Sequence, residues 1–127
     1  MTRYIGGLFL TVFILLTAVA AFAESAEVML SACRPIIKAK INEEVVTLPE
    51  NSQVGMCWGA FSVIQKVITQ ADYKSKKKVY GVCAPPKSTR TQLITIFVNY
   101  AEKNPQRLHE DFFYVAMDSL KESFKCK

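Results

Sequence analysis

Four cysteines spread along the chain constrain its fold more than any other feature of the sequence. They are Cys33, Cys57, Cys83 and Cys126, and no two of them form a C-x-x-C pair. The sequence contains one histidine, His109, so the ligands that a structural zinc site needs are scarce. In an oxidising compartment, an even number of widely spaced cysteines favours disulfide bonds over a metal centre.

The N-terminus indicates that the chain reaches such a compartment. Arg3 is followed by an almost uninterrupted apolar run over residues 4–19 and then by the triplet Ala-Phe-Ala at 21–23. A basic start, a short apolar segment and an A-x-A cleavage site are typical of a secretory signal peptide. We therefore predict a signal peptide over residues 1–23 and an exported domain over residues 24–127, with no membrane segment after cleavage. The alternative is an uncleaved N-terminal anchor.

The exported domain would contain 104 residues (127 minus 23), enough for one hydrophobic core. Without Arg3, 15 of the 16 basic residues remain against 11 acidic ones, a net charge of +4. This charge favours solubility and a mild attraction to acidic partners. Nucleic acid is not an expected partner, because an exported protein rarely meets it.

Apolar residues at helical spacing predict an all-α domain, a small bundle of four to five helices. The first helix is expected over 25–33 and should end before Pro35, because proline disfavours the helical conformation of the preceding residue. Residues 36–50 are expected to form a helical turn and an extended arm. The second helix is expected over 55–71, where Gly59 suggests the close approach of another backbone.

The C-terminal half predicts two more helices after a short extended piece at 79–82. Thr89 and Gln92 have the spacing of a capping box, which begins a helix that should end near Lys103. An Asn-Pro pair then supplies an N-cap and a first helical residue, so a continuous fourth helix is expected over 104–124.

The lengths of these last two helices choose among the three ways in which four cysteines can pair. Joined by a tight link, helices of about 14 and about 20 residues run antiparallel, with lengths of roughly 21 and 30 Å. Cys126 would then lie about 9 Å beyond the start of the shorter helix, within reach of Cys83. The expected pairs are therefore Cys83 with Cys126 and Cys33 with Cys57.

The sequence contains no set of residues that is typical of an active site. His109 has no free thiol to activate if every cysteine is paired. The acidic pairs at 43–44 and 110–111 are sequence neighbours, which point in different directions on a helix and do not form a shared acid-base site. There is no glycine-rich phosphate loop. We expect a protein that binds another protein and is not an enzyme, with no cofactor and no metal.

The polar segment 72–78 after the second helix is the expected partner-binding site. Its lysines repel one another, which holds the segment in solvent, and they would steer the protein toward an acidic cleft while a tyrosine anchors the contact. A loop that is merely solvated is the alternative. The residues assigned to partner binding are Tyr73, Lys74, Lys76, Lys77 and Lys78.

Three consecutive aromatic residues, Phe112, Phe113 and Tyr114, indicate a further contact surface. On a helix about 100° separates each residue from the next, so the three side chains cannot all face one core. At least one should lie in a groove or a subunit contact, which motivates the prediction of a homodimer.

Four motifs recur along nearly the whole exported domain: LSAC at 30–33, CWGAF at 57–61, CAP at 83–85 with Gln92 downstream, and NP at 104–105 through His109 to FKC at 124–126. In order and spacing they resemble the motifs of the Rap/Tai family of small periplasmic proteins. Two features depart from the family pattern: Lys125 stands where proline usually precedes the last cysteine, and Pro86 follows the usual C-x-P.

This resemblance implies an all-helical fold with two disulfides, frequent dimerisation and a periplasmic location. It also implies an immunity protein that binds a peptidoglycan amidase effector of type VI secretion and obstructs its active-site cleft. The inhibitory residues vary among relatives, so none is transferred to this chain. A periplasmic chaperone of the HdeA type is the alternative, although one histidine and a pI of about 9.1 argue against activation tuned to acid.

Overall fold

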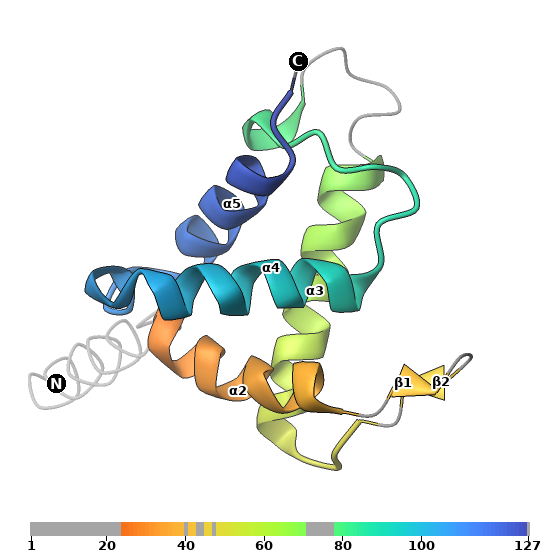
Figure 1. The fold of residues 1–127 in the computed structure, drawn as a ribbon, viewed down its shortest axis with the longest axis vertical. Coiled ribbons are helices and arrows are strands. Elements are labelled where there is room, and N and C mark those ends of the chain that lie inside the picture. The colour runs from red at the N-terminus through yellow and green to blue at the C-terminus, as the bar shows by residue number, and fades with distance from the viewer. Residues whose placement is uncertain (1–23, 40, 43–44, 47, 71–77, 127) are drawn as a thin grey trace, which may run out of the picture.

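A computed structural model describes residues 24–39, 41–42, 45–46, 48–70 and 78–126. Four α-helices dominate this part of the chain (Figure 1), which confirms the predicted all-α class. The elements, in chain order, are α2 (Ala26–Lys38), β1 (Ile41–Asn42), β2 (Val45–Val46), α3 (Ser52–Gln70), the 3-10 helix η2 (Val79–Gly81), α4 (Arg90–Lys103), the 3-10 helix η3 (Pro105–Arg107) and α5 (Phe112–Ser123).

Helix α4 lies across the other three helices and packs against each of them (Figure 1). The centre of the core is a cluster of three phenylalanines, one each from α3, α4 and α5. The ring centroids of Phe61 and Phe97 are 5.7 Å apart, and the ring of Phe112 lies 5.6 Å from Phe61 and 5.2 Å from Phe97. Burying these rings provides much of the apolar driving force that holds the helices together.

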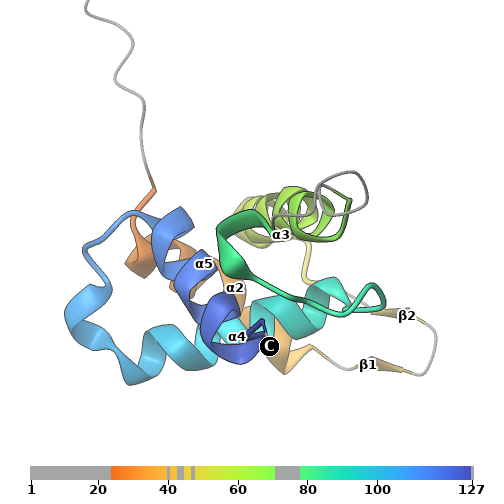
Figure 2. The ribbon, with the colours of Figure 1, turned by 90° about the horizontal axis from the view of Figure 1, so that it is seen from above.

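Helix α2 continues through Pro35, so the predicted end of the first helix was wrong. A proline inside a helix removes one backbone donor, but the following residue, Ile36, is fully buried and keeps the last turn packed on the core. The chain leaves the helical conformation at Ala39. Beyond it β1 and β2 form an antiparallel hairpin, with Ile41 opposite Val46, that projects from the helices (Figure 2). This hairpin agrees with the extended arm expected within residues 36–50.

The start of the described chain is fastened to the turn before α5. The amides of Ala26 and Glu27 donate to the carbonyls of Glu110 and Leu108 over 2.9 and 3.0 Å, and the amide of Phe112 donates to the carbonyl of Glu24 over 2.9 Å. The first two bonds satisfy amides in the first turn of α2, and the third satisfies the first amide of α5, none of which has a partner within its own helix.

The same bonds explain why the predicted fourth helix was wrong. Residues 104–124 do not form one helix, because two carbonyls in its first part accept from α2 and are not available for helical bonds. The Asn-Pro pair therefore starts only the single turn of η3. A new helix begins when the side chain of Asp111 accepts a hydrogen bond from the amide of Phe113 over 2.8 Å.

The other helix boundaries follow from their caps. The amide of Gln92 donates to the side chain of Thr89 over 3.2 Å, which confirms the predicted start of α4, and α4 ends at Lys103 as expected. Helix α3 begins three residues earlier than predicted, because the side chain of Asn51 accepts from the amide of Gln53 over 2.8 Å. No other part of the described chain lies within 4 Å of a Cβ placed on Gly59, so the expected close approach is not found there.

Both predicted disulfides are confirmed. Cys33 and Cys57 are fully buried and join α2 to the first turns of α3. Cys83 and Cys126 are joined at the surface, where the amide of Cys83 also donates to the carbonyl of Phe124 over 2.9 Å. One bridge therefore lies in the core, and the other fixes the C-terminus against the segment that leads to α4.

Candidate partner-binding site

The structure describes only one residue of the predicted partner-binding segment. Tyr73, Lys74, Lys76 and Lys77 lie outside the described residues. Lys78 is described: it is exposed and directly precedes η2. The lysine-rich segment therefore leads into η2, and the described surface around η2 is the place to look for a contact site.

Two successive residues of η2 have left-handed backbone conformations. Tyr80 has φ 53° and Gly81 has φ 70°. Glycine adopts this conformation without cost, whereas a bulky side chain there costs on the order of 1 kcal/mol or more. The predicted extended piece at 79–82 was wrong because this turn replaces it. Backbone strain of this kind is concentrated at functional positions, and here it presents a tyrosine to solvent.

The ring of Tyr80 lies against the aromatic residues at the start of α5. Its centroid is 5.4 Å from that of Phe113, which is 6.0 Å from that of Tyr114. We call Tyr80, Phe113 and Tyr114 the aromatic strip. Tyr80 is 53% exposed and Tyr114 is 59% exposed, whereas the neighbouring Phe112 is buried. The prediction that the three consecutive aromatics face different ways is confirmed.

A network around Arg107 fixes the position of α5 and so of the strip. Its guanidinium donates to the carboxylates of Glu110 over 2.6 Å and Asp118 over 2.8 Å, and to the phenol oxygen of Tyr100 over 2.8 Å. Hydrogen bonds with the two carboxylates raise the pKa of Arg107, and the bond from Arg107 lowers the pKa of Glu110. Charge-assisted bonds of this kind hold the turn before α5 against α4.

A groove of about 670 Å³ lies next to the strip, beside the surface disulfide. Its charged lining consists of two lysines and two carboxylates from α5 and the chain end, so it has no strong preference for either sign of charge. The lining residues are Gly81, Tyr100, Asp118, Lys121, Glu122, Lys125 and Cys126. Together with the strip, the groove gives this side of the molecule aromatic side chains bordered by mixed charges, which is typical of protein-binding surfaces.

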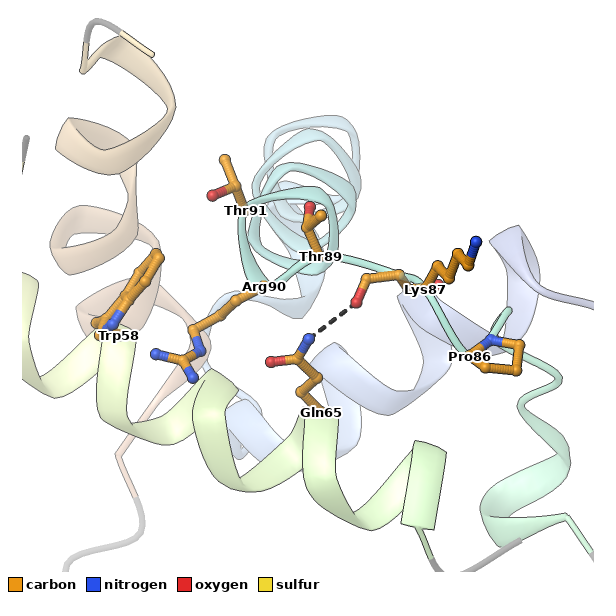
Figure 3. Close-up of a pocket in the computed structure, with 8 residues that line it drawn as sticks. Trp58, Gln65, Pro86, Lys87, Thr89, Arg90 and Thr91 are labelled. Carbon is orange, nitrogen blue, oxygen red and sulfur yellow. Dashed lines mark hydrogen bonds between the residues drawn. The ribbon is translucent and has the colours of Figure 1, made fainter. Parts of the chain in front are cut away.

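A second groove, of about 610 Å³, lies between α3 and the start of α4 (Figure 3). The guanidinium of Arg90 stacks 4.5 Å from the ring centroid of Trp58, and the side chain of Gln65 donates to the carbonyl of Ser88 over 2.8 Å. The Ser88 hydroxyl and the Arg90 Nε are buried without a hydrogen-bond partner in the described chain. Leaving such groups unpaired costs about 1 to 3 kcal/mol each, so the groove is a site that a ligand could complete.

The described residues contain no arrangement typical of catalysis. His109 is exposed, and every cysteine is in a disulfide. Within the described ranges, no three residues among His, Cys, Asp and Glu come together as metal ligands. The described chain also contains no helix that is long and apolar enough to cross a membrane.

Comparison with known families bears on the choice between an immunity protein and a chaperone. Residues 25–126 match the family of Rap1a immunity proteins. The chain belongs to this family. No curated protein and no solved structure matches it.

As an effector immunity protein, the chain belongs to a class that generally has no enzymatic activity and binds a cognate effector. The expected family resemblance is therefore confirmed. Sequence reasoning missed Tyr80 and the groove beside Trp58 as parts of this immunity protein's surface. Tyr80 could have been found from the Tyr-Gly pair between the lysines and Cys83, because glycine favours a left-handed turn. The pairing of Trp58 with Arg90 joins residues far apart in the sequence and gives no local signal.

Proposed function

We propose that this chain is a periplasmic immunity protein that binds a peptidoglycan amidase effector of type VI secretion and blocks its active-site cleft. The family match supports an effector as the partner, and the Rap/Tai motifs support an amidase of the cell wall. The observation that carries the proposal is the aromatic strip, in which Tyr80, just after the lysine-rich segment, and Tyr114 of α5 are both exposed and both contact the ring of Phe113.

The strip has the properties of a binding hot spot. Tyrosine buries a large area with few rotatable bonds, so it loses little conformational entropy when a partner covers it. The contact of Tyr80 with Phe113 restrains its ring before binding, which reduces that loss further. The lysines that precede η2 add positive charge, which would speed association with an acidic cleft.

Export is part of the proposal, because a cell-wall amidase acts outside the cytoplasm. We propose that residues 1–23 are removed as a signal peptide and that residues 24–127 form the mature protein. The N-terminal sequence of protein recovered by osmotic shock should begin at Glu24. Protein that keeps Met1 and sediments with membranes would instead indicate an anchor.

A homodimer remains part of the proposed function. The exposed valines of α3, Val63 and Val67, are apolar surface that a second copy could cover. Light scattering over a range of concentrations measures the molar mass directly. A molar mass that stays at that of one mature chain at high concentration would refute the dimer.

The central experiment captures the partner and tests its chemistry. The mature protein is immobilised, periplasmic proteins are captured, and each captured protein is assayed for cleavage of peptidoglycan with and without added immunity protein. The proposal expects an amidase that loses activity on binding. Capture of many unfolded proteins at low pH, with no inhibited amidase, would favour the chaperone alternative.

Variants then test whether the aromatic strip is the surface that contacts the effector. Tyr80→Ala and Tyr114→Ala should each weaken inhibition by about 2 kcal/mol, or roughly thirtyfold in Kd, if they are hot spots. Val28→Ala is the matched control, because Val28 is 42% exposed and lies on α2, outside both the strip and the surface proposed for the dimer. Equal losses for the tyrosine and valine variants would remove the aromatic strip from the interface.

A further inference from the structure

The groove between α3 and the start of α4 has features of a ligand site that lies apart from the aromatic strip. The segment after η2 runs past the end of α3 to the start of α4, so the strip and the groove lie at opposite ends of residues 82–89 (Figure 1). The apolar side chains of Trp58 and Pro86 stand at its two edges (Figure 3). Between them, the side chain of Arg90 projects into the space between Trp58 and Gln65 (Figure 3).

The charged residues of this groove have one sign. Arg90 and Lys87 line it, and no carboxylate of the described residues does. The remaining polar lining is uncharged. The groove also lies at the N-terminus of α4, a helix of 14 residues, where the first amides have no helical acceptor and the helix dipole favours an anion.

A second observation points to a ligand. Ser88 lines the groove, and its hydroxyl is buried without a partner in the described chain, the residue being only 4% exposed. The Nε of Arg90 is likewise buried without an acceptor in the part of the chain that the structure describes. The stack on Trp58 and the bond from Gln65 to the carbonyl of Ser88 hold both groups in place.

We propose that this groove binds a carboxylate group. The guanidinium of Arg90 offers parallel donors that match the two oxygens of a carboxylate, and the hydroxyl of Ser88 supplies a third donor. A planar carboxylate on an apolar chain fits the flat guanidinium and the apolar edges, and a phosphate monoester is the alternative that the titration tests. The apolar edges would contact the chain that carries the carboxylate, so the ligand is a peptide with either an acidic side chain or a free C-terminus.

The first experiment titrates the mature protein with defined probes. Trp58 is the only tryptophan of the sequence, so its fluorescence reports on the groove, and the Nε–H signal of Arg90 is observed by nitrogen-edited NMR. The probes are acetyl-Gly-Glu-Gly-amide for a side-chain carboxylate, acetyl-Gly-Gly-Gly with a free C-terminus, acetyl-Gly-Gln-Gly-amide as the neutral control, and inorganic phosphate.

We expect either carboxylate peptide to shift both signals saturably. The glutamine peptide should shift neither. The carboxylate peptide that binds more tightly shows whether the groove prefers an acidic side chain or a free C-terminus. Equal responses to the glutamine peptide, tighter binding of phosphate, or no saturable response to any probe would overturn the proposal. No effector is involved, so failure here leaves the proposed immunity function intact.

Variants separate binding from folding. Arg90→Lys keeps the charge but loses the paired donors, and Ser88→Ala removes the unpartnered hydroxyl. Each variant should bind the carboxylate peptide with an affinity lower by roughly tenfold. Arg34→Lys, which changes an arginine on α2, is the matched control and should bind as the parent does. Ser88→Ala should melt no lower than the parent, because no protein partner is lost. Unchanged affinity in both groove variants would refute the assignment.

Discussion

The guanidinium of Arg107 donates a 2.8 Å hydrogen bond to the phenol oxygen of Tyr100 and so ties the turn after α4 back to α4 itself. The same guanidinium bonds two carboxylates, one in the turn at Glu110 and one in α5 at Asp118. Arg107 is therefore the one residue in the described chain through which η3, α4 and α5 are joined by charged hydrogen bonds. Its removal should affect the position of the whole aromatic strip.

Arg107→Met should lower the free energy of unfolding by about 2 kcal/mol. Hydrogen bonds to charged groups contribute about 1.5 to 3 kcal/mol when they are partly buried, and the Arg107 side chain is 22% exposed. Urea unfolding followed by circular dichroism measures the change. Arg34→Met is the matched control, because its ion pair with Glu102 is about half exposed and should contribute less than about 1 kcal/mol. Equal losses would show that the network adds nothing beyond a surface ion pair.

The stability of the fold should depend on the ionisation of Glu110. Its pKa is lowered in the folded protein by the hydrogen bond from Arg107, so the ionised form stabilises the fold at pH values above the ordinary value of 4.5. That contribution is lost as the pH falls through the lower, folded-state pKa. Unfolding free energies of the parent and of Glu110→Gln, measured from about pH 7 to about pH 3, should converge at the acid end. A constant difference across this range would contradict the assignment.

The surface disulfide should be reduced before the buried one. Cys126 is exposed, whereas Cys33 and Cys57 are fully buried and can be reached only when the core opens. Mild reductant followed by alkylation and mass spectrometry should therefore label Cys83 and Cys126 first. Simultaneous labelling of all four cysteines would contradict this order.

Removal of the surface disulfide should also destabilise the fold strongly. The bridge closes a loop with a sequence separation of 43 residues, for which chain entropy predicts about 4 kcal/mol. Cys83→Ser combined with Cys126→Ser avoids a free thiol, and its melting temperature should fall far more than that of a surface variant such as Lys66→Ser. A melting curve equal to that of the parent would refute the role of the bridge.

Local signals in the sequence predicted the helices better than their boundaries. Thr89 caps α4 as expected because the bond is made between near neighbours. The predicted cysteine pairs are present, although the long helix used to derive them is divided into η3 and α5. The start of α5 could not be predicted, because the carbonyls of Leu108 and Glu110 accept from residues more than 80 positions earlier in the chain. Such a bond leaves no trace in local periodicity.

The candidate site was predicted only in part for the same reason. The consecutive aromatics indicated an exposed ring, and Tyr114 is that ring. The partner of Phe113 in the strip, Tyr80, comes from a turn 33 residues earlier (113 minus 80), and its exposure depends on a left-handed backbone. Periodicity describes helices and strands, so it cannot place a side chain that a turn presents.

Two glycines should respond in opposite ways to alanine. Gly59 lies within α3, and a Cβ placed there has no neighbour within 4 Å, so Gly59→Ala should stabilise the fold by about 0.5 to 1 kcal/mol. Gly81 has φ 70° beside the strained Tyr80, so Gly81→Ala should destabilise it by about 1 to 2 kcal/mol. Urea unfolding at low protein concentration measures both. If Gly59→Ala instead lowered stability, and more so at high concentration, the close backbone approach expected at Gly59 would be made by a second copy of the chain.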